Sequence, residues 1–82
     1  MLRISRLTDY ATVILASLSG GALASAADIA ERTHIGLPTV SKLLKELQHA
    51  GLVRSVRGAR GGYQLARPAA SISAAEIIDA VE

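Results

Sequence analysis

The stretch of residues 36–63, GLPTVSKLLKELQHAGLVRSVRGARGGY, constrains the fold of this chain more than any other. Pro38 suits the first turn of a helix, where its missing N–H would have no partner. The apolar residues that follow recur at i, i+3, i+4 and i+7, the spacing of one buried helical face; they are Val40, Leu43, Leu44 and Leu47. Gly51 comes next, where a left-handed cap needs a residue without Cβ. This part therefore predicts an amphipathic helix that ends just before Gly51.

Two β-rich segments follow that helix. Residues 52–57 are rich in strand formers and residues 63–65 alternate apolar and polar side chains, so we expect a strand in each. The glycines of residues 58–62 permit the positive φ angles of a tight turn. This turn carries Arg60, and Arg57 comes just before it. A helix with a polar outer face beside a basic hairpin is the layout of a winged helix-turn-helix that reads DNA.

The chain before residue 36 predicts two shorter helices. An apolar stripe places the first at residues 8–19, with Thr8 as its N-cap. Ser25 and Asp28 have the spacing of a capping box, which places the second helix at residues 26–33. A turn then joins it to the third helix and completes a helix-turn-helix unit. The residues expected to pack from these two helices are Leu7, Tyr10, Ala11, Ile14, Leu15, Leu18, Ala27, Ile29 and Ala30.

A final helix is expected at residues 74–81, because Ser73 and Glu76 repeat the capping-box spacing. Its apolar side, formed by Ile77, Ile78 and Val81, is hypothesised to be exposed as the start of an interface. The fold class is then mainly α with a small β-hairpin. We expect one winged helix-turn-helix domain over residues 1–82, with three helices, a two-stranded wing and the start of a further helix.

Charge is segregated along the chain. Residues 38–75 carry six basic groups and one acid, whereas the remainder carries three basic and six acidic groups. Segregated positive charge indicates a polyanionic partner, because phosphate neutralisation supplies most non-specific affinity for nucleic acids. We expect double-stranded DNA. An RNA-binding winged helix is an alternative, disfavoured because Tyr10 and Tyr63 are the only aromatic residues available for stacking on bases.

The candidate contacts lie on three elements. The front of the third helix offers Thr39, Ser41, Lys42 and Lys45 to the major groove and its phosphates. The hairpin offers Arg57 and Arg60 to a groove or to phosphate. Arg54, on the strand, is expected to contact phosphate or nothing. The helix starts at Ser25 and Thr8 could present N–H groups to phosphate. The plainer alternatives are a solvated helix face and an ordinary hairpin turn.

Other chemistries find little support in the sequence. The chain has no cysteine, and neither His34 nor His49 has a partner at the spacing of metal ligands, so we expect no metal site and no disulfide. Ser41 has no histidine–acid pair that the sequence places beside it, and the GARGG turn lacks the P-loop pattern. We therefore expect no enzymatic activity. The apolar N-terminal stretch has helical rhythm with an acid inside it, so we expect a structural helix of a cytoplasmic protein, without a signal peptide or membrane span.

Three segments together carry a resemblance to a known family: RLTDYATVIL, then GLPTVSKLLKELQHAGLVRSVRGARGGYQLARP, then ISAAEIIDAVE. They resemble the bacterial iron–sulfur-linked transcriptional regulators of the IscR and NsrR type, with the regulator of the SUF cluster-assembly operon as the nearest likeness. The similarity covers almost all 82 residues, and its most specific part is the wing sequence.

The resemblance implies a winged helix, a homodimer on a partly palindromic operator, and control of iron–sulfur assembly genes as a repressor or activator. The family's recognition-helix residues correspond to Pro38, Thr39, Ser41 and Lys42, and its minor-groove wing arginine to Arg57. Some members have an acid where Ser41 stands, so base preference is expected to differ from theirs.

Family sensors also bind an iron–sulfur cluster through three cysteines in a loop beyond the final motif, followed by a long dimerisation helix. This chain ends at Glu82, before either part, and we expect either a truncated DNA-binding fragment or a protein without the sensing half. No cofactor is expected in this chain. The main alternative function is a winged-helix protein–protein interaction module that does not bind specific DNA.

Overall fold

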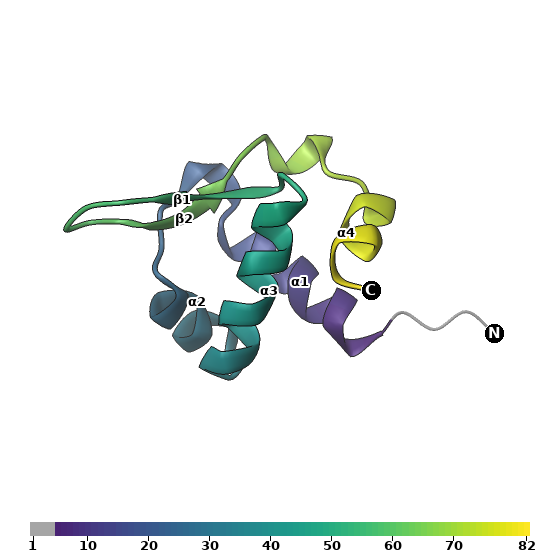
Figure 1. Cartoon of the computed structure of the whole chain (residues 1–82), viewed down its shortest axis with the longest axis horizontal. Helices are drawn as coiled ribbons and strands as arrows, with labels where there is room; N and C mark the ends of the chain where they lie inside the picture. Colours follow the sequence, from purple (N-terminus) through teal and green to yellow (C-terminus); the bar gives the residue numbers. More distant parts are fainter. Residues whose placement is uncertain (1–4) are drawn as a thin grey trace.

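The computed structural model describes residues 5–82, which form four α-helices and a two-stranded hairpin (Figure 1). In chain order the elements are α1 (Arg6–Ser17), η1 (Ser19–Gly21), α2 (Ala26–Thr33), α3 (Leu37–His49), β1 (Val53–Val56), β2 (Gly62–Leu65), η2 (Ala69–Ser71) and α4 (Ala74–Val81), where η marks a short 3₁₀ turn. The helices cluster around α3, and the hairpin projects from one side of that cluster. This arrangement is a winged helix-turn-helix, as predicted.

Helix α3 is the centre of the core. Its four predicted apolar residues, Val40, Leu43, Leu44 and Leu47, are fully buried. The helix contacts α1, α2, α4 and β1, so its apolar face is covered from every side. Each such side chain stabilises the fold by about 1.5–3 kcal/mol relative to an exposed one. The helix ends as predicted, with Gly51 at a φ of +77°.

Helix α1 begins earlier than predicted. Its N-cap is Ser5, whose hydroxyl accepts a hydrogen bond from the Thr8 backbone N–H at 3.2 Å, so the prediction of Thr8 as N-cap and helix start is wrong. Thr8 is instead buried, and its hydroxyl donates to a Glu82 carboxylate oxygen at 2.7 Å. The Ser5 hydroxyl donates to the same carboxylate. Ser5 is the cap because its backbone is extended and its hydroxyl reaches the N–H of the first turn, in which Thr8 already lies. The helix also ends two residues before the expected Ser19, which belongs to η1.

Helix α2 has the predicted bounds and the predicted capping box. The Ser25 hydroxyl accepts from the Asp28 N–H at 3.1 Å, and the Ser25 N–H donates to the Asp28 carboxylate at 3.2 Å. Ile29 is fully buried, as expected. Ala27, however, is exposed, so its predicted role in packing is wrong. It lies two positions from Ile29, which places it on the opposite side of the helix.

The hairpin has the predicted antiparallel form, with Val53 opposite Leu65 and Val56 opposite Gly62. Its first strand is one residue shorter at each end than predicted. The structure adds a third partner, because Ala24 forms a β-bridge with Tyr63. A single bridging residue has no alternation of its own, and the sequence pattern therefore gave no sign of it.

Helix α4 has the predicted bounds and capping box, but its apolar side was placed wrongly. Ile77 and Val81 are buried in the same core as α3, and Ile78 alone of the three stays exposed, at 40%. The hypothesis of an exposed apolar face formed by all three residues is therefore wrong. Helix α4 packs against α1 and α3, and two of its three apolar side chains are covered by these helices.

Candidate nucleic-acid interface

The outer face of α3 is polar and accessible. Pro38, Lys42 and Lys45 are exposed, whereas Thr39 and Ser41 are half-buried at the rim of the core. The N-cap residue is Gly36, which has no side chain to cap the first turn. The N–H groups of that turn therefore lack a side-chain partner and remain available to a phosphate or a base edge.

The turn between α2 and α3 sets the angle of the helix-turn-helix. His34 ends α2 in the left-handed conformation, with a φ of 59° and a ψ of 24°. Ile35 is buried in this turn and anchors it to the core. The two helices contact one another directly. The front of α3 is thus held by α2, and His34 adopts the left-handed conformation of this turn with its side chain exposed.

The wing, which we define as residues 53–65, carries arginines at its outer turn and on its first strand. Arg57 and Arg60 are exposed at its outer turn, and Arg54 is exposed on β1. The Arg54 Nε donates to the amide oxygen of Gln64 at 2.8 Å, and Gln64 is its direct partner across the hairpin. The sequence pattern did not single out Gln64, which orients Arg54 along the surface of the sheet.

Gly61 closes the outer turn of the wing. Its N–H donates to the Gly58 carbonyl at 2.9 Å. A Cβ at this position would lie 2.3 Å from the Val56 carbonyl oxygen, closer than such atoms can approach. The turn beside Arg60 therefore requires a glycine here, which gives a structural reason for the glycine-rich tip.

The basic groups proposed for contact form no ion pair with an acidic side chain in residues 5–82. In the described part of the chain the only ion pair joins Arg67 to Glu76, at 2.6 Å. We call the remaining set the basic surface; it comprises Lys42, Lys45, Arg54, Arg57 and Arg60. Because none of these five cations is held in an ion pair within residues 5–82, their charge remains available to attract phosphate. Glu46, one helical turn from Lys42 on α3, is the single acid in the sequence between Lys42 and Arg67.

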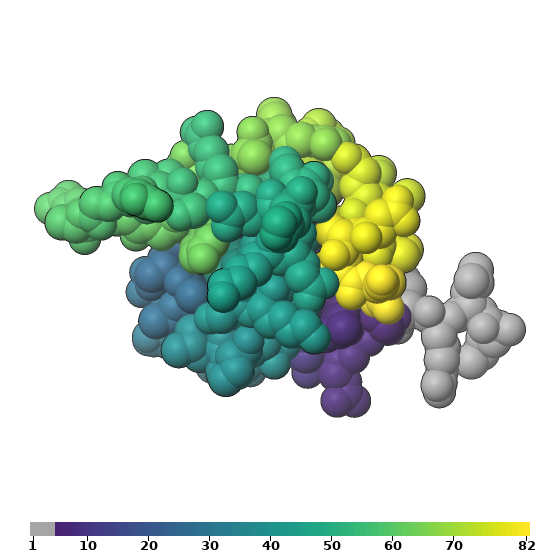
Figure 2. Space-filling model, in the orientation of Figure 1, coloured from purple at the N-terminus to yellow at the C-terminus, as the bar shows by residue number. Residues whose placement is uncertain are grey.

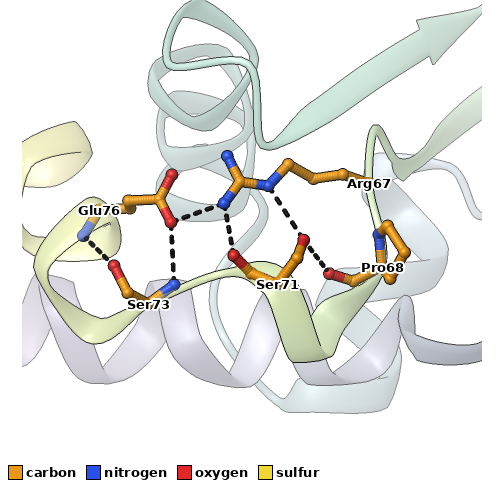
Figure 3. Close-up of polar contacts among 5 residues, drawn as sticks. All are labelled: Arg67, Pro68, Ser71, Ser73 and Glu76. Atoms are coloured by element: carbon orange, nitrogen blue, oxygen red, sulfur yellow. Dashed lines mark hydrogen bonds and ion pairs between the residues drawn. The ribbon is translucent and has the colours of Figure 1, made fainter.

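Arg67 contributed to the positive charge counted along residues 38–75, but it does not lie on the basic surface. It is held in a cluster of polar contacts between the end of β2 and the start of α4 (Figure 3). Its guanidinium donates to the Ser71 hydroxyl at 3.1 Å, to the Ser71 carbonyl and to Glu76. Glu76 also accepts from the Ser73 backbone N–H at 3.0 Å. The pKa of Glu76 is lowered from its usual value of 4.5 to about 2. The hydrogen bond from Arg67 has the largest effect, and the hydrogen bond from the Ser73 N–H has the next largest. Arg67 therefore ties the end of β2 to the start of α4.

Ser25 offers less to a phosphate than the sequence suggested. Its backbone N–H and the acceptor side of its hydroxyl are used in the capping box with Asp28. The hydrogen bonds from the backbone and side chain of Ser25 lower the pKa of Asp28, with a smaller effect from Arg32, so the carboxylate stays charged. The hydroxyl hydrogen of Ser25 remains able to donate, but a negative charge stands beside it. Contact at Ser25 stays a prediction.

The elements that carry the basic surface lie together. Figure 2 shows α3 and the wing exposed side by side on one face of the molecule, with the wing extending beyond the helical body. Helix α3 also contacts β1 directly. Near the end of α3, Lys45 lines a shallow hollow of about 420 Å³ together with Gln48 and His49. The helix and the wing therefore form one continuous surface on this face of the molecule.

The residues do not fit the iron–sulfur cluster that the resemblance implies for longer family members. Such a cluster needs thiolate ligands, and the chain contains no cysteine. Within residues 5–82, no group of three or more His, Cys, Asp or Glu side chains could hold a metal ion. No helix in that part of the chain is long and apolar enough to cross a membrane.

Comparison with known sequences agrees with this geometry. A family model described as Rrf2, iron-dependent transcriptional regulator, matches residues 4–82. The HTH-type transcriptional regulator IscR of Cereibacter sphaeroides is 45% identical over an alignment 86 positions long, which covers 99% of this chain and 56% of that protein. IscR of Escherichia coli is 48% identical over 56 residues, which cover 68% of this chain and 35% of that protein.

Solved structures show the same fold. IscR from T. potens matches with a TM-score of 0.83 and 40% identity, over 99% of this chain and 61% of that one. CymR (YrzC), described as the global cysteine regulator of B. subtilis, matches with a TM-score of 0.85 and 35% identity, over 100% of this chain and 66% of that one. The matched part of this chain therefore spans about a third to two thirds of the length of these relatives.

Proposed function

The chain belongs to the Rrf2 family of transcriptional regulators, and from this premise we propose that it binds double-stranded DNA sequence-specifically to control genes of iron–sulfur cluster assembly. The observation that carries the proposal is the basic surface, whose five cations have no acid partner in residues 5–82 and lie on the recognition helix and the wing. Helix α3 supplies base contacts from Thr39, Ser41 and Lys42, with Pro38 setting its first turn.

The wing supplies the second contact of this proposed interface. Arg57 and Arg60 enter a minor groove or reach phosphates, since a narrow groove has the most negative potential and favours arginine. Lys45 and Arg54 contact phosphates and fix the register without reading bases. Because these contacts come from two elements with a fixed spacing, a duplex must present a groove to α3 and a minor groove or phosphates to the wing at the same time.

The biological setting is part of the same proposal. Control of cluster assembly rests on the likeness to IscR and on the description of the family as iron-dependent. The nearer likeness to the regulator of the SUF operon stays a prediction. We further propose that the protein acts as a homodimer on a partly palindromic operator, as a repressor or an activator, in the bacterial cytoplasm where such DNA lies. No catalytic activity is proposed.

The experiment is a salt-titrated binding assay on duplexes selected from a random pool by the 82-residue chain. If all five cations contact phosphate, the slope of log K against log[salt] should reach about −4.5 for each bound chain, since each contact contributes about −0.9. The selected site should also bind at least ~10³ times more tightly than a scrambled duplex. A shallow slope, or equal affinity for both duplexes, would contradict the proposal and favour a protein-docking module. The number of chains bound per site tests the homodimer.

A further inference from the structure

A backbone junction joins the wing to the segment that enters α2. The Ala24 N–H donates to the Tyr63 carbonyl at 3.0 Å, and the Tyr63 N–H donates to the Ala24 carbonyl at 2.7 Å. Ala24 is 2% exposed and directly precedes Ser25, the N-cap of α2. Strand β2 is therefore bonded to the helix-turn-helix at its entrance, in addition to its pairing with β1.

Gly62 makes this close approach possible. A Cβ at residue 62 would lie 2.6 Å from the Ala24 carbonyl oxygen, 2.7 Å from the Ala24 carbonyl carbon and 3.0 Å from the Ser25 nitrogen. All three are backbone atoms, so no side-chain rotation can relieve the overlap. Either the bridge opens or the start of β2 moves away. Gly62 also pairs with Val56, so a displacement at this point carries the outer part of the wing with it.

We propose that Gly62 is a positioning residue that fixes the wing tip relative to α3, an inference that rests on the proposed function. The connection runs from Gly62 through Ala24 to α2, and α2 packs directly on α3. A duplex that meets both α3 and the wing must match this fixed spacing. Specific binding therefore depends on Gly62, whereas non-specific attraction to phosphate does not, because substitution of a glycine leaves every charge in place.

The first test compares Gly62→Ala with Gly20→Ala in the 82-residue chain. Gly20 has a φ of +83° and an added Cβ there meets no atom within 4 Å, so this control strains the backbone without any such overlap. Gly62→Ala should lower affinity for the selected site about tenfold, the scale of losing one specific contact. Its affinity for a scrambled duplex should change less than twofold. Gly20→Ala should keep both affinities while circular dichroism shows it folded. Equal losses on both duplexes for Gly62→Ala would overturn the proposal.

The second test needs no DNA. Because the chain has no cysteine, spin labels on Ala59→Cys and Gln48→Cys report the distance between the wing tip and α3. The distance distribution should be narrow in the parent chain and in Gly20→Ala, and shifted or broadened in Gly62→Ala. An unchanged distribution in Gly62→Ala would overturn the proposal whatever the DNA affinity. If the parent chain bound no duplex, the proposed function would fail while this distance measurement would still decide the role of Gly62.

Amide exchange in the parent chain covers the case in which Gly62→Ala does not fold. The Ala24 and Tyr63 amides, which donate across the bridge, should exchange as slowly as the hydrogen-bonded amides of α2. Exchange of these two amides at the rate of the exposed turn around Gly58 would overturn the proposal, because the bridge would then be open too often to hold the wing.

Discussion

Helix α3 and the wing form the two halves of the proposed interface, but different forces hold them in place. Helix α3 has four fully buried apolar residues and contacts three other helices and β1. The wing is fixed mainly by backbone hydrogen bonds, and its outer turn is exposed. Val53 is buried at its base, whereas Tyr63 and Leu65 are only partly buried against the core.

Because different forces hold α3 and the wing, substitutions should affect the two elements differently. Close-packed apolar contacts hold α3, and they depend on side-chain volume rather than on charge or pH. The wing depends on backbone geometry at Ala24 and Gly62 and on the polar link from Arg67 to Glu76 just beyond β2. Substitutions behind α3 should therefore affect stability first, and substitutions on the wing should affect DNA recognition first.

The largest effect is expected from Leu43→Ala behind α3. Removal of a fully buried leucine leaves a cavity and should lower the free energy of unfolding by about 2–5 kcal/mol, a large part of the total for a small domain. The same substitution at the half-buried Leu65 of the wing should cost less than half as much. Urea unfolding followed by circular dichroism measures both. Equal losses would break the comparison, because the wing would then be anchored by packing as firmly as α3.

The next effect is expected from Arg57→Ala at the wing tip. This change should weaken binding to the selected site by about 1–3 kcal/mol, because it removes one groove contact. Stability should change by less than about 0.5 kcal/mol, since the side chain is exposed and makes no hydrogen bond within residues 5–82. Arg57→Lys is the matched control: it keeps the charge but not the planar fork, and should restore only non-specific affinity.

A smaller effect is expected from Lys45→Ala on the outer face of α3. Loss of one phosphate contact should weaken binding to all sequences alike and reduce the magnitude of the salt slope by about 1. Arg32→Ala removes the same charge from α2, outside the basic surface, and should leave the slope nearly unchanged. If Lys45→Ala and Arg57→Ala gave equal, sequence-blind losses in the binding assay, the wing would not discriminate between sequences.

The smallest effect is expected on stability at low pH, through the ion pair of Arg67 and Glu76 just beyond β2. The pKa of Glu76 is lowered from 4.5 to about 2, so the stability from its charged form is complete above pH 4.5 and is lost as the pH falls from 4.5 to 2. The effect is small because the Arg67 and Glu76 side chains are 36% and 38% exposed, and solvent screens the pair.

Glu76→Gln should therefore be slightly less stable than the parent at pH 6 and should lose less of its stability on acidification. Thermal unfolding between pH 6 and pH 2.5 measures this difference. Asp28 also has a lowered pKa and loses stability in the same direction, but it does so in parent and variant alike. Asp79→Asn, which changes an exposed acid outside any ion pair in residues 5–82, should keep the acid response of the parent. Identical curves for Glu76→Gln and the parent would show that Arg67 does not stabilise the wing base.

Local signals in the sequence were sufficient for most of the fold. The bounds of α2 and α4 and both capping boxes were predicted correctly, because each box joins residues only three positions apart. The buried face of α3 was also predicted, since the helical period places Val40, Leu43, Leu44 and Leu47 on one side. The wing arginines could be proposed for a related reason: residues 47–75 contain no acid, so the local sequence offers these arginines no partner. Arg67 marks where this signal fails, because it pairs with Glu76 nine positions away.

The sequence by itself thus determined where α2, α3 and α4 lie, which face of α3 is buried, and that the hairpin tip is basic. Only the tertiary structure decided that Thr8 contacts Glu82, that Ala24 bridges Tyr63, and that Ile77 and Val81 enter the core. It also decided that Arg67 is paired with Glu76 while the five cations of the basic surface are not. The physical reason is range: periodicity and capping act within a few residues, whereas these contacts join segments whose closeness depends on how the helices pack.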